Sequence, residues 1–120
     1  MKTILIVDDA KIPAMIIQRA LGFHNFSFLY ANSGAEGIET FKSNTVDLIM
    51  VDLVMPGMNG FEMVSKIRDF NDKVPIIAVA INIPENHRFN YQSKGFTDMI
   101  FLPPMVPCVL KIKVNTNLLE

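Results

Sequence analysis

Five short runs of apolar and β-branched residues recur along the chain, with longer mixed segments between them. The runs are residues 3–7, 26–31, 48–51, 76–80 and 99–102. Short runs that are apolar throughout are typical of strands in a parallel sheet buried on both faces, and their alternation with longer segments predicts βα units. A chain of 120 residues has room for one hydrophobic core, so we expect a single domain over residues 1–120.

Three of the intervening helices are predicted from the spacing of their apolar residues or from the residues at their ends. Residues 11–21 fit a helix that ends at Gly22, because glycine is common just past a helix terminus. Residues 84–94 fit a short helix with few apolar side chains, and residues 104–120 fit a helix whose end has poor propensity. The apolar residues at helical spacing are Ile12, Ile16, Ile17, Ala20 and Leu21 in the first of these, and Val106, Val109, Leu110 and Val114 in the last.

Two further helices are expected to begin at patterns typical of a capping box. Ser33 stands three residues before Glu36, and Asn59 stands three residues before Glu62. In this arrangement the two side chains satisfy backbone N–H groups at the start of the helix. The residues expected to face the sheet are Ala35, Ile38 and Phe41 in the earlier helix and Phe61, Val64 and Ile67 in the later one.

The alternation of five strands with five helices predicts an α/β protein of the (βα)5 type. We expect a doubly wound, five-stranded parallel sheet with the strand order 2-1-3-4-5, counted along the chain. In sheets of this kind the ligand site lies at the carboxyl ends of the strands. Polar residues that follow the strands are therefore the first candidates for a site.

Three aspartates follow two strands that are neighbours in this order. Asp8 and Asp9 come just after residues 3–7, and Asp52 comes directly after residues 48–51. An aspartate after a strand is also common as a helix cap or a turn residue, but three at one edge favour a shared site. Carboxylates this close raise one another's pKa unless a cation neutralises them. Because oxygen ligands select a hard ion, we expect Mg²⁺.

Two stretches of the chain form a specific pattern, the pair Asp8-Asp9 and the run Asp52-Leu53-Val54-Met55-Pro56-Gly57-Met58-Asn59-Gly60. Together they resemble the receiver domain of two-component response regulators, and the similarity in order and spacing covers nearly all 120 residues. The resemblance implies a flavodoxin-like fold and a stand-alone, cytoplasmic phosphoprotein similar to the chemotaxis regulators.

The resemblance also implies roles for individual residues. Asp52 would accept a phosphoryl group from a histidine kinase or a histidine phosphotransfer protein, in a Mg²⁺-dependent phosphorelay. Asp8, Asp9 and Asp52 would hold the ion, together with the backbone carbonyl of Val54. The residues that would shape the loop before the third helix are Pro56, Gly57 and Gly60.

The sequence departs from the family at three positions that normally carry the signal. Ala80 stands where the family has Thr or Ser, Leu102 where it has Lys, and Met99 at the aromatic switch position. With two carboxylates, one Mg²⁺ and a phosphoryl group of about −1.5 to −2, the phosphorylated site would keep roughly two negative charges. Lys11, two residues after Asp9, is a candidate for a substitute cation.

The same resemblance implies a signalling switch and not an enzyme, with at most self-phosphorylation from small phosphodonors and slow autodephosphorylation. Output would pass to an unidentified protein through the face formed by residues 84–94, 99–102 and 104–120, which is also a candidate homodimer surface. A degenerate receiver that acts by phosphorylation-independent binding is the main alternative, because of Ala80 and Leu102.

Two alternatives of other classes share the expected architecture. A phosphohydrolase with an aspartate nucleophile would need a second Asp two residues later, where this chain has Val54. A flavodoxin-like cofactor binder would need hydrogen-bond donors after the first strand, where Asp8 and Asp9 would repel a phosphate. Both alternatives are therefore disfavoured.

The composition limits the classes of partner that we expect for the protein. Eleven basic residues against 12 acidic ones give a net charge of −1 with no basic cluster, which argues against nucleic acid as a partner. The apolar run at residues 3–7 is far shorter than a signal sequence or a membrane span, so no membrane association is expected. The single cysteine, Cys108, cannot form an internal disulfide, which fits a reducing cytoplasm.

Overall fold

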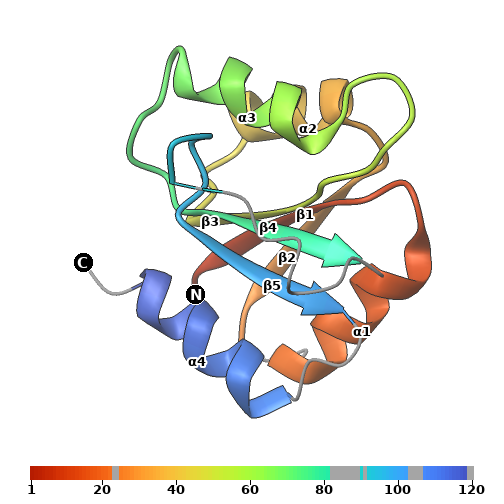
Figure 1. The fold of residues 1–120 in the computed structure, drawn as a ribbon. Helices are drawn as coiled ribbons and strands as arrows, with labels where there is room; N and C mark the ends of the chain where they lie inside the picture. The colour runs from red at the N-terminus through yellow and green to blue at the C-terminus, as the bar shows by residue number, and fades with distance from the viewer. Residues whose placement is uncertain (23–24, 82–89, 91, 103–106, 119–120) are drawn as a thin grey trace.

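The computed structural model describes residues 1–22, 25–81, 90, 92–102 and 107–118 (Figure 1). Its elements are β1 (Thr3–Val7), α1 (Lys11–Leu21), β2 (Ser27–Ala31), α2 (Gly34–Ser43), β3 (Leu48–Asp52), α3 (Gly60–Arg68), β4 (Ile76–Ile81), β5 (Asp98–Leu102) and α4 (Pro107–Leu118). All five predicted strands are confirmed. The helix predicted at residues 84–94 falls mostly outside the described residues, and residues 92–95 form a turn.

The five strands form one parallel sheet in the order β2-β1-β3-β4-β5, as predicted. Figure 1 shows α2 and α3 on one face of the sheet and α1 and α4 on the other. In the central pair, Val7 of β1 lies beside Val51 of β3. Because parallel strands run the same way, the chain leaves both strands at the same edge of the sheet.

The sheet separates two hydrophobic cores. Successive residues of a strand point to opposite faces, so Leu5 and Val7 pack beneath α2 and α3, whereas Ile4 and Ile6 pack against α1 and α4. This burial on both faces explains why the central strands are apolar throughout. Within the described residues, no helix is long and apolar enough to cross a membrane.

The helical spacing assigned three residues to the wrong face. Ile12 is 70% exposed and Ile16 is 50% exposed, and the side chain of Ala35 is also exposed. A helix that lies on a sheet buries a narrow stripe, and residues one position away from this stripe point to solvent. The buried stripe consists of Ala14, Ile17 and Leu21 in α1 and of Gly34, Gly37 and Ile38 in α2.

The two predicted capping boxes differ in the structure. At α3, Asn59 accepts from the N–H of Glu62, whose carboxylate accepts from the N–H of Asn59, so the box is complete. At α2, Ser33 accepts from the N–H of Glu36, but the Glu36 carboxylate accepts from the N–H of Asn32. The second box is therefore only half formed, although the helix begins where it was predicted.

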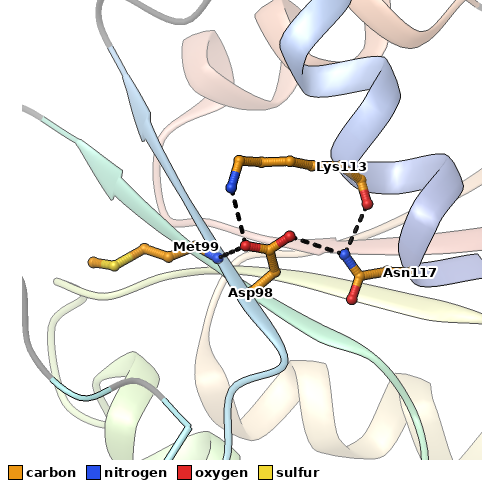
Figure 2. A network of polar contacts seen from close by, with 4 residues as sticks. All are labelled: Asp98, Met99, Lys113 and Asn117. Carbon is orange, nitrogen blue, oxygen red and sulfur yellow. Dashed lines mark hydrogen bonds and ion pairs between the residues drawn. The ribbon is translucent and has the colours of Figure 1, made fainter.

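A set of polar contacts, here called the Asp98 clamp, holds α4 against the first residues of β5 (Figure 2). Lys113 Nζ lies 3.0 Å from Asp98 Oδ1, and Asn117 Nδ2 donates to Asp98 Oδ2 at 3.1 Å. The backbone N–H of Met99 also donates to Asp98 Oδ1. Lys113 and Asn117 are one helical turn apart, so one face of α4 supplies both partners. The Asp98 clamp was not predicted from the sequence.

Asp98→Ala should lower the free energy of unfolding by about 2 kcal/mol, because hydrogen bonds to a partly buried charge contribute this much. Urea unfolding followed by circular dichroism measures the loss. The matched control is Lys2→Ala, which breaks the exposed ion pair with Asp47 and should cost less than about 0.5 kcal/mol. Equal losses in the two variants would contradict a stabilising role for the clamp.

Candidate metal centre at the carboxyl edge of the sheet

Three carboxylates meet where β1 and β3 end. Asp8 follows β1 directly, Asp9 is the next residue, and Asp52 is the last residue of β3. One oxygen from each of the three lies within 4.8 Å of the others. Asp8 and Asp52 are each only 7% exposed, whereas Asp9 is open to solvent. The structure therefore brings together the three acidic residues that the sequence placed at this edge.

Backbone hydrogen bonds fix the two buried carboxylates. The N–H of Ala10 donates to Asp8 Oδ1 at 2.9 Å, and the N–H of Val54 donates to Asp52 Oδ1 at 3.1 Å. The N–H of Asp8 itself donates to the carbonyl of Ala31 in the neighbouring strand. Each carboxylate is thus oriented by a backbone N–H group of the turn that follows its strand. The Val54 side chain is 69% exposed beside this turn.

Burial and like charge disfavour the ionised form of both carboxyl groups. Burial, followed by the nearby charges of Asp52 and Asp9, raises the pKa of Asp8 from 3.8 to about 7, against the hydrogen bond from Ala10. Burial also raises the pKa of Asp52, and the charge of Asp9 acts in the same direction. The Asp8 and Asp52 carboxyl groups interact directly, which favours a proton on Asp8 and a charge on Asp52.

The donor set fits a hard divalent cation. All three side chains offer carboxylate oxygens, which are the ligands that Mg²⁺ prefers, and their spacing suits one shared ion. A cation here would also relieve the repulsion that raises the pKa of Asp8. The residues present therefore fit the magnesium site expected from the sequence.

The loop after β3 passes close to Asp52. Gly57 has a φ of +74°, which side chains rarely tolerate, and Pro56 before it is exposed. A Cβ on Gly60 would lie 2.6 Å from the carbonyl oxygen of Asp52, so only glycine fits there. The N–H of Gly60 donates to the carbonyl of Leu53 and closes the loop. The loop thus packs directly against the backbone of the buried carboxylate.

The three divergent positions lie in β4 and β5. Ala80 and Met99 are buried in the core beneath α2 and α3, and Leu102 is the last residue of β5. Neither Ala80 nor Met99 has a hydroxyl group or an aromatic ring. Phe101 is 6% exposed and belongs to the same core. Within the described residues, no ion pair joins Lys11 to the three carboxylates.

A cavity of about 460 Å³, not predicted from the sequence, lies beside Asp8, between α1 and β2. Short side chains leave this space open, namely Ala10, Ala14 and Ala31. The polar residues that line it are Lys11, Gln18, Tyr30 and Asn32. Tyr30 and Gln18 hydrogen-bond to each other across it. Four of the lining residues, at positions 11, 14, 15 and 18, are spaced so that they share one face of α1. This spacing is the sequence pattern from which the helix face that lines the cavity could have been predicted.

Comparisons with known proteins agree with this geometry. A family profile described as the response regulator receiver domain matches residues 4–104. The sensor kinase/phosphatase LuxN of Vibrio harveyi is 40% identical over 78 residues, which cover 65% of this chain and 9% of LuxN. The transcriptional regulatory protein YvrH of Bacillus subtilis is 35% identical over 119 residues, which cover 97% of this chain and 48% of YvrH. The chain thus spans less than half the length of these curated relatives.

Solved structures show the same fold. A putative response regulator from Chloroflexus aurantiacus superimposes with a TM-score of 0.88 at 24% identity, over 98% of this chain and 97% of that one. The chemotaxis protein CheY4 of Vibrio cholerae superimposes with a TM-score of 0.81 at 23% identity, over 98% of both chains. At these identities the likeness establishes the doubly wound fold.

The metal-free protein should lose stability as the pH rises from about 4 to about 7. In this window folded Asp8, with a pKa of about 7, holds a proton that the unfolded chain has released. Asp8→Asn should remove this dependence and be more stable than the wild type at about pH 8. Thermal unfolding in EDTA across the window measures both effects. Mg²⁺ should raise the stability of the wild type at about pH 8. If the stability of the wild type and that of Asp8→Asn changed with pH in the same way, the raised pKa of Asp8 would be contradicted.

Gly60→Ala should cost about 2 kcal/mol or more, because its Cβ would meet the Asp52 carbonyl oxygen at 2.6 Å. It should also weaken Mg²⁺ binding by moving Asp52. The control is Gly57→Ala, which meets nothing within 4 Å and should cost only about 1 kcal/mol from its positive φ. Chemical unfolding and Mg²⁺ titration test the pair, and a milder effect at Gly60 than at Gly57 would refute the close approach.

Proposed function

The chain belongs to the response regulator receiver domain family, and from this premise we propose that it is a phosphorylation-dependent switch with Asp52 as the phosphoacceptor. We propose further that residues 1–120 act as one receiver domain. The observation that carries the proposal is the convergence of Asp8, Asp9 and Asp52 within 4.8 Å at one edge of the sheet.

In this proposal, Asp8, Asp9 and Asp52 hold Mg²⁺, with the backbone carbonyl of Val54 as a further ligand. When bound, the ion supplies positive charge that offsets the repulsion between a carboxylate and an incoming phosphoryl group. Phosphoryl transfer needs little more than positioning and charge neutralisation, and the fixed carboxylates supply the positioning.

Asp52 has the properties that a phosphoacceptor needs. The N–H of Val54 donates to Oδ1 at 3.1 Å and orients the carboxylate, and in this proposal Oδ2 forms the bond to phosphorus. As that bond forms, the bond from phosphorus to the donor breaks, and the donor group leaves with the electron pair. The interaction with Asp8 favours the charged form of Asp52, which is the nucleophilic form. Asp8 loses its proton when a cation binds.

The donor in this proposal is a histidine kinase or a histidine phosphotransfer protein. Exposed apolar side chains on α1, namely Ile12, Met15 and Ile16, lie on the helix that follows Asp8 and Asp9. Together with the exposed Val54, they favour contact with a protein surface at this edge. The relatives include one named as a sensor kinase/phosphatase, which fits a donor of this class.

The output in this proposal is contact with another protein through the face formed by residues 84–94, β5 and residues 104–120. A homodimer through the same face is part of the proposal. Because Ala80 has no hydroxyl group and Met99 has no aromatic ring, the proposed output does not depend on such groups at positions 80 and 99. A degenerate receiver, which binds its partner without phosphorylation, is the second candidate because positions 80 and 102 lack the hydroxyl and the charge.

Incubation with acetyl phosphate and Mg²⁺ should add one phosphoryl group to the wild type and none to Asp52→Asn, as measured by intact mass. EDTA should prevent the reaction, because Mg²⁺ offsets the repulsion between the anions. Asp69→Asn, which changes an exposed carboxylate at the end of α3, is the matched control and should react like the wild type.

Two results would count against the phosphorylated switch. A wild-type protein that binds Mg²⁺ but gains no phosphoryl group would favour the degenerate receiver. A phosphoryl group that persists in Asp52→Asn would place the acceptor on another residue.

A further inference from the structure

The cavity of about 460 Å³ between α1 and β2 has no part in the proposed function. Its volume lies in the range of about 300 to 1,000 Å³ that is typical of small-molecule sites. Of the three clustered carboxylates, Asp8 lines the cavity, whereas Asp9 and Asp52 are not among its lining residues. The cavity is therefore a space distinct from the metal centre, with one side chain in common.

The cavity exists because one residue of the buried stripe of α1 is short. The stripe consists of Ala14, Ile17 and Leu21, and Ala14 is the member that lines the cavity. On the sheet side, Ile6 of β1 lies beside Tyr30 of β2. A methyl group at position 14 thus stands where a longer side chain would close the gap between α1 and the sheet.

Polar side chains line the cavity toward two ends. Asp8 directly follows β1, Asn32 directly follows β2 and Lys11 begins α1, so these three lie toward the carboxyl edge of the sheet. Gln18 is two turns further along α1, about 10 Å from the start of the helix, and it hydrogen-bonds to Tyr30. Such a site can hold a molecule that has a hydrogen-bonding group at each end.

The charges of the lining favour an uncharged ligand. Among the described residues that line the cavity, Asp8 is the one acidic residue and Lys11 is the one basic residue. Both lie toward the same end, so a charged group that one of them attracts is repelled by the other. Because burial of a charge beside a like charge is costly, a neutral molecule suits this lining best.

The walls of the cavity favour an aromatic body for the ligand. Tyr30 is 45% exposed and Met15 is 50% exposed, so both present apolar surface that a ligand would remove from water. An aromatic ring packs favourably against a tyrosine ring and against a methionine thioether. Ile6 and Ala14 add aliphatic surface to the same cavity.

We propose that this cavity is a binding site for a small, uncharged aromatic molecule with a hydrogen-bonding group at each end. Its ring packs against Tyr30 and Met15, one end group lies beside Asp8 and Asn32, and the other lies beside Gln18. Binding involves no covalent step and needs no phosphoryl group, so this inference goes beyond the proposed function and does not rest on it.

The probe is 4-hydroxybenzyl alcohol, an uncharged ring with a hydroxyl group at each end. Two charged compounds with the same ring, 4-hydroxybenzoate and 4-hydroxybenzylammonium, are compared with it. Titration into the full chain should shift the amide NMR signals of α1, β2 and the end of β1 when the alcohol binds. The two charged compounds should bind about tenfold more weakly, because each brings a charge close to a like charge.

Ala14→Leu should abolish binding of the alcohol, because the longer side chain fills the space beneath α1. Ala35→Leu makes the same change at an exposed position of α2, so it is the matched control and should bind like the wild type. Tyr30→Ala should weaken binding roughly tenfold through the loss of the ring contact. Since Tyr30 is half-exposed, this variant provides the test even if Ala14→Leu does not fold.

A second measurement separates ligand binding from a general loss of structure. The affinity for Mg²⁺ should be the same in Ala14→Leu, Tyr30→Ala and the wild type, because the metal centre is a distinct space. Three results would overturn the inference: no binding of the alcohol by the wild type, equal affinities for all three compounds, or unchanged binding in both cavity variants. Acceptance of a phosphoryl group by Asp52 is measured separately by intact mass, so these results leave the proposed function intact.

Discussion

Repulsion among three carboxylates is the constraint on which the rest of the structure depends. The parallel pairing of β1 with β3 brings Asp8, Asp9 and Asp52 to one edge, and two of them are buried. Isolated from partners, charges in such a place are costly. The surrounding structure reduces that cost with backbone N–H groups from two turns and with a proton on Asp8. Because a divalent cation would relieve this repulsion, the three carboxylates favour the binding of such an ion.

The features that the sequence predicted are those with local signals. Apolar runs identified the strands within one residue, and their alternation with helices predicted the strand order. Charged residues directly after two apolar runs identified the acidic cluster, because the ends of neighbouring parallel strands must meet. The complete capping box at Asn59 and Glu62 was also predictable from the sequence, because its two partners are only three residues apart.

The features that the sequence did not predict depend on distant contacts. The exposure of Ile12 and Ile16 depends on which side of α1 faces the sheet, and the spacing of its apolar residues alone does not determine that side. The Asp98 clamp joins residues 15 and 19 positions apart. The cavity beside Asp8 depends on short side chains from two elements that are apart in the sequence. The helix predicted at residues 84–94 stays a prediction for the residues outside the described part of the chain.

The position of the Asp98 clamp has a consequence for how the protein tolerates substitution. The clamp lies at the amino end of β5, whereas the acidic cluster lies at the carboxyl ends of β1 and β3. A five-residue strand is about 16 Å long, so the two groups of charges share no neighbour. Substitutions at this separation usually have additive effects. Substitutions at the acidic edge should therefore leave the attachment of α4 to β5 unchanged.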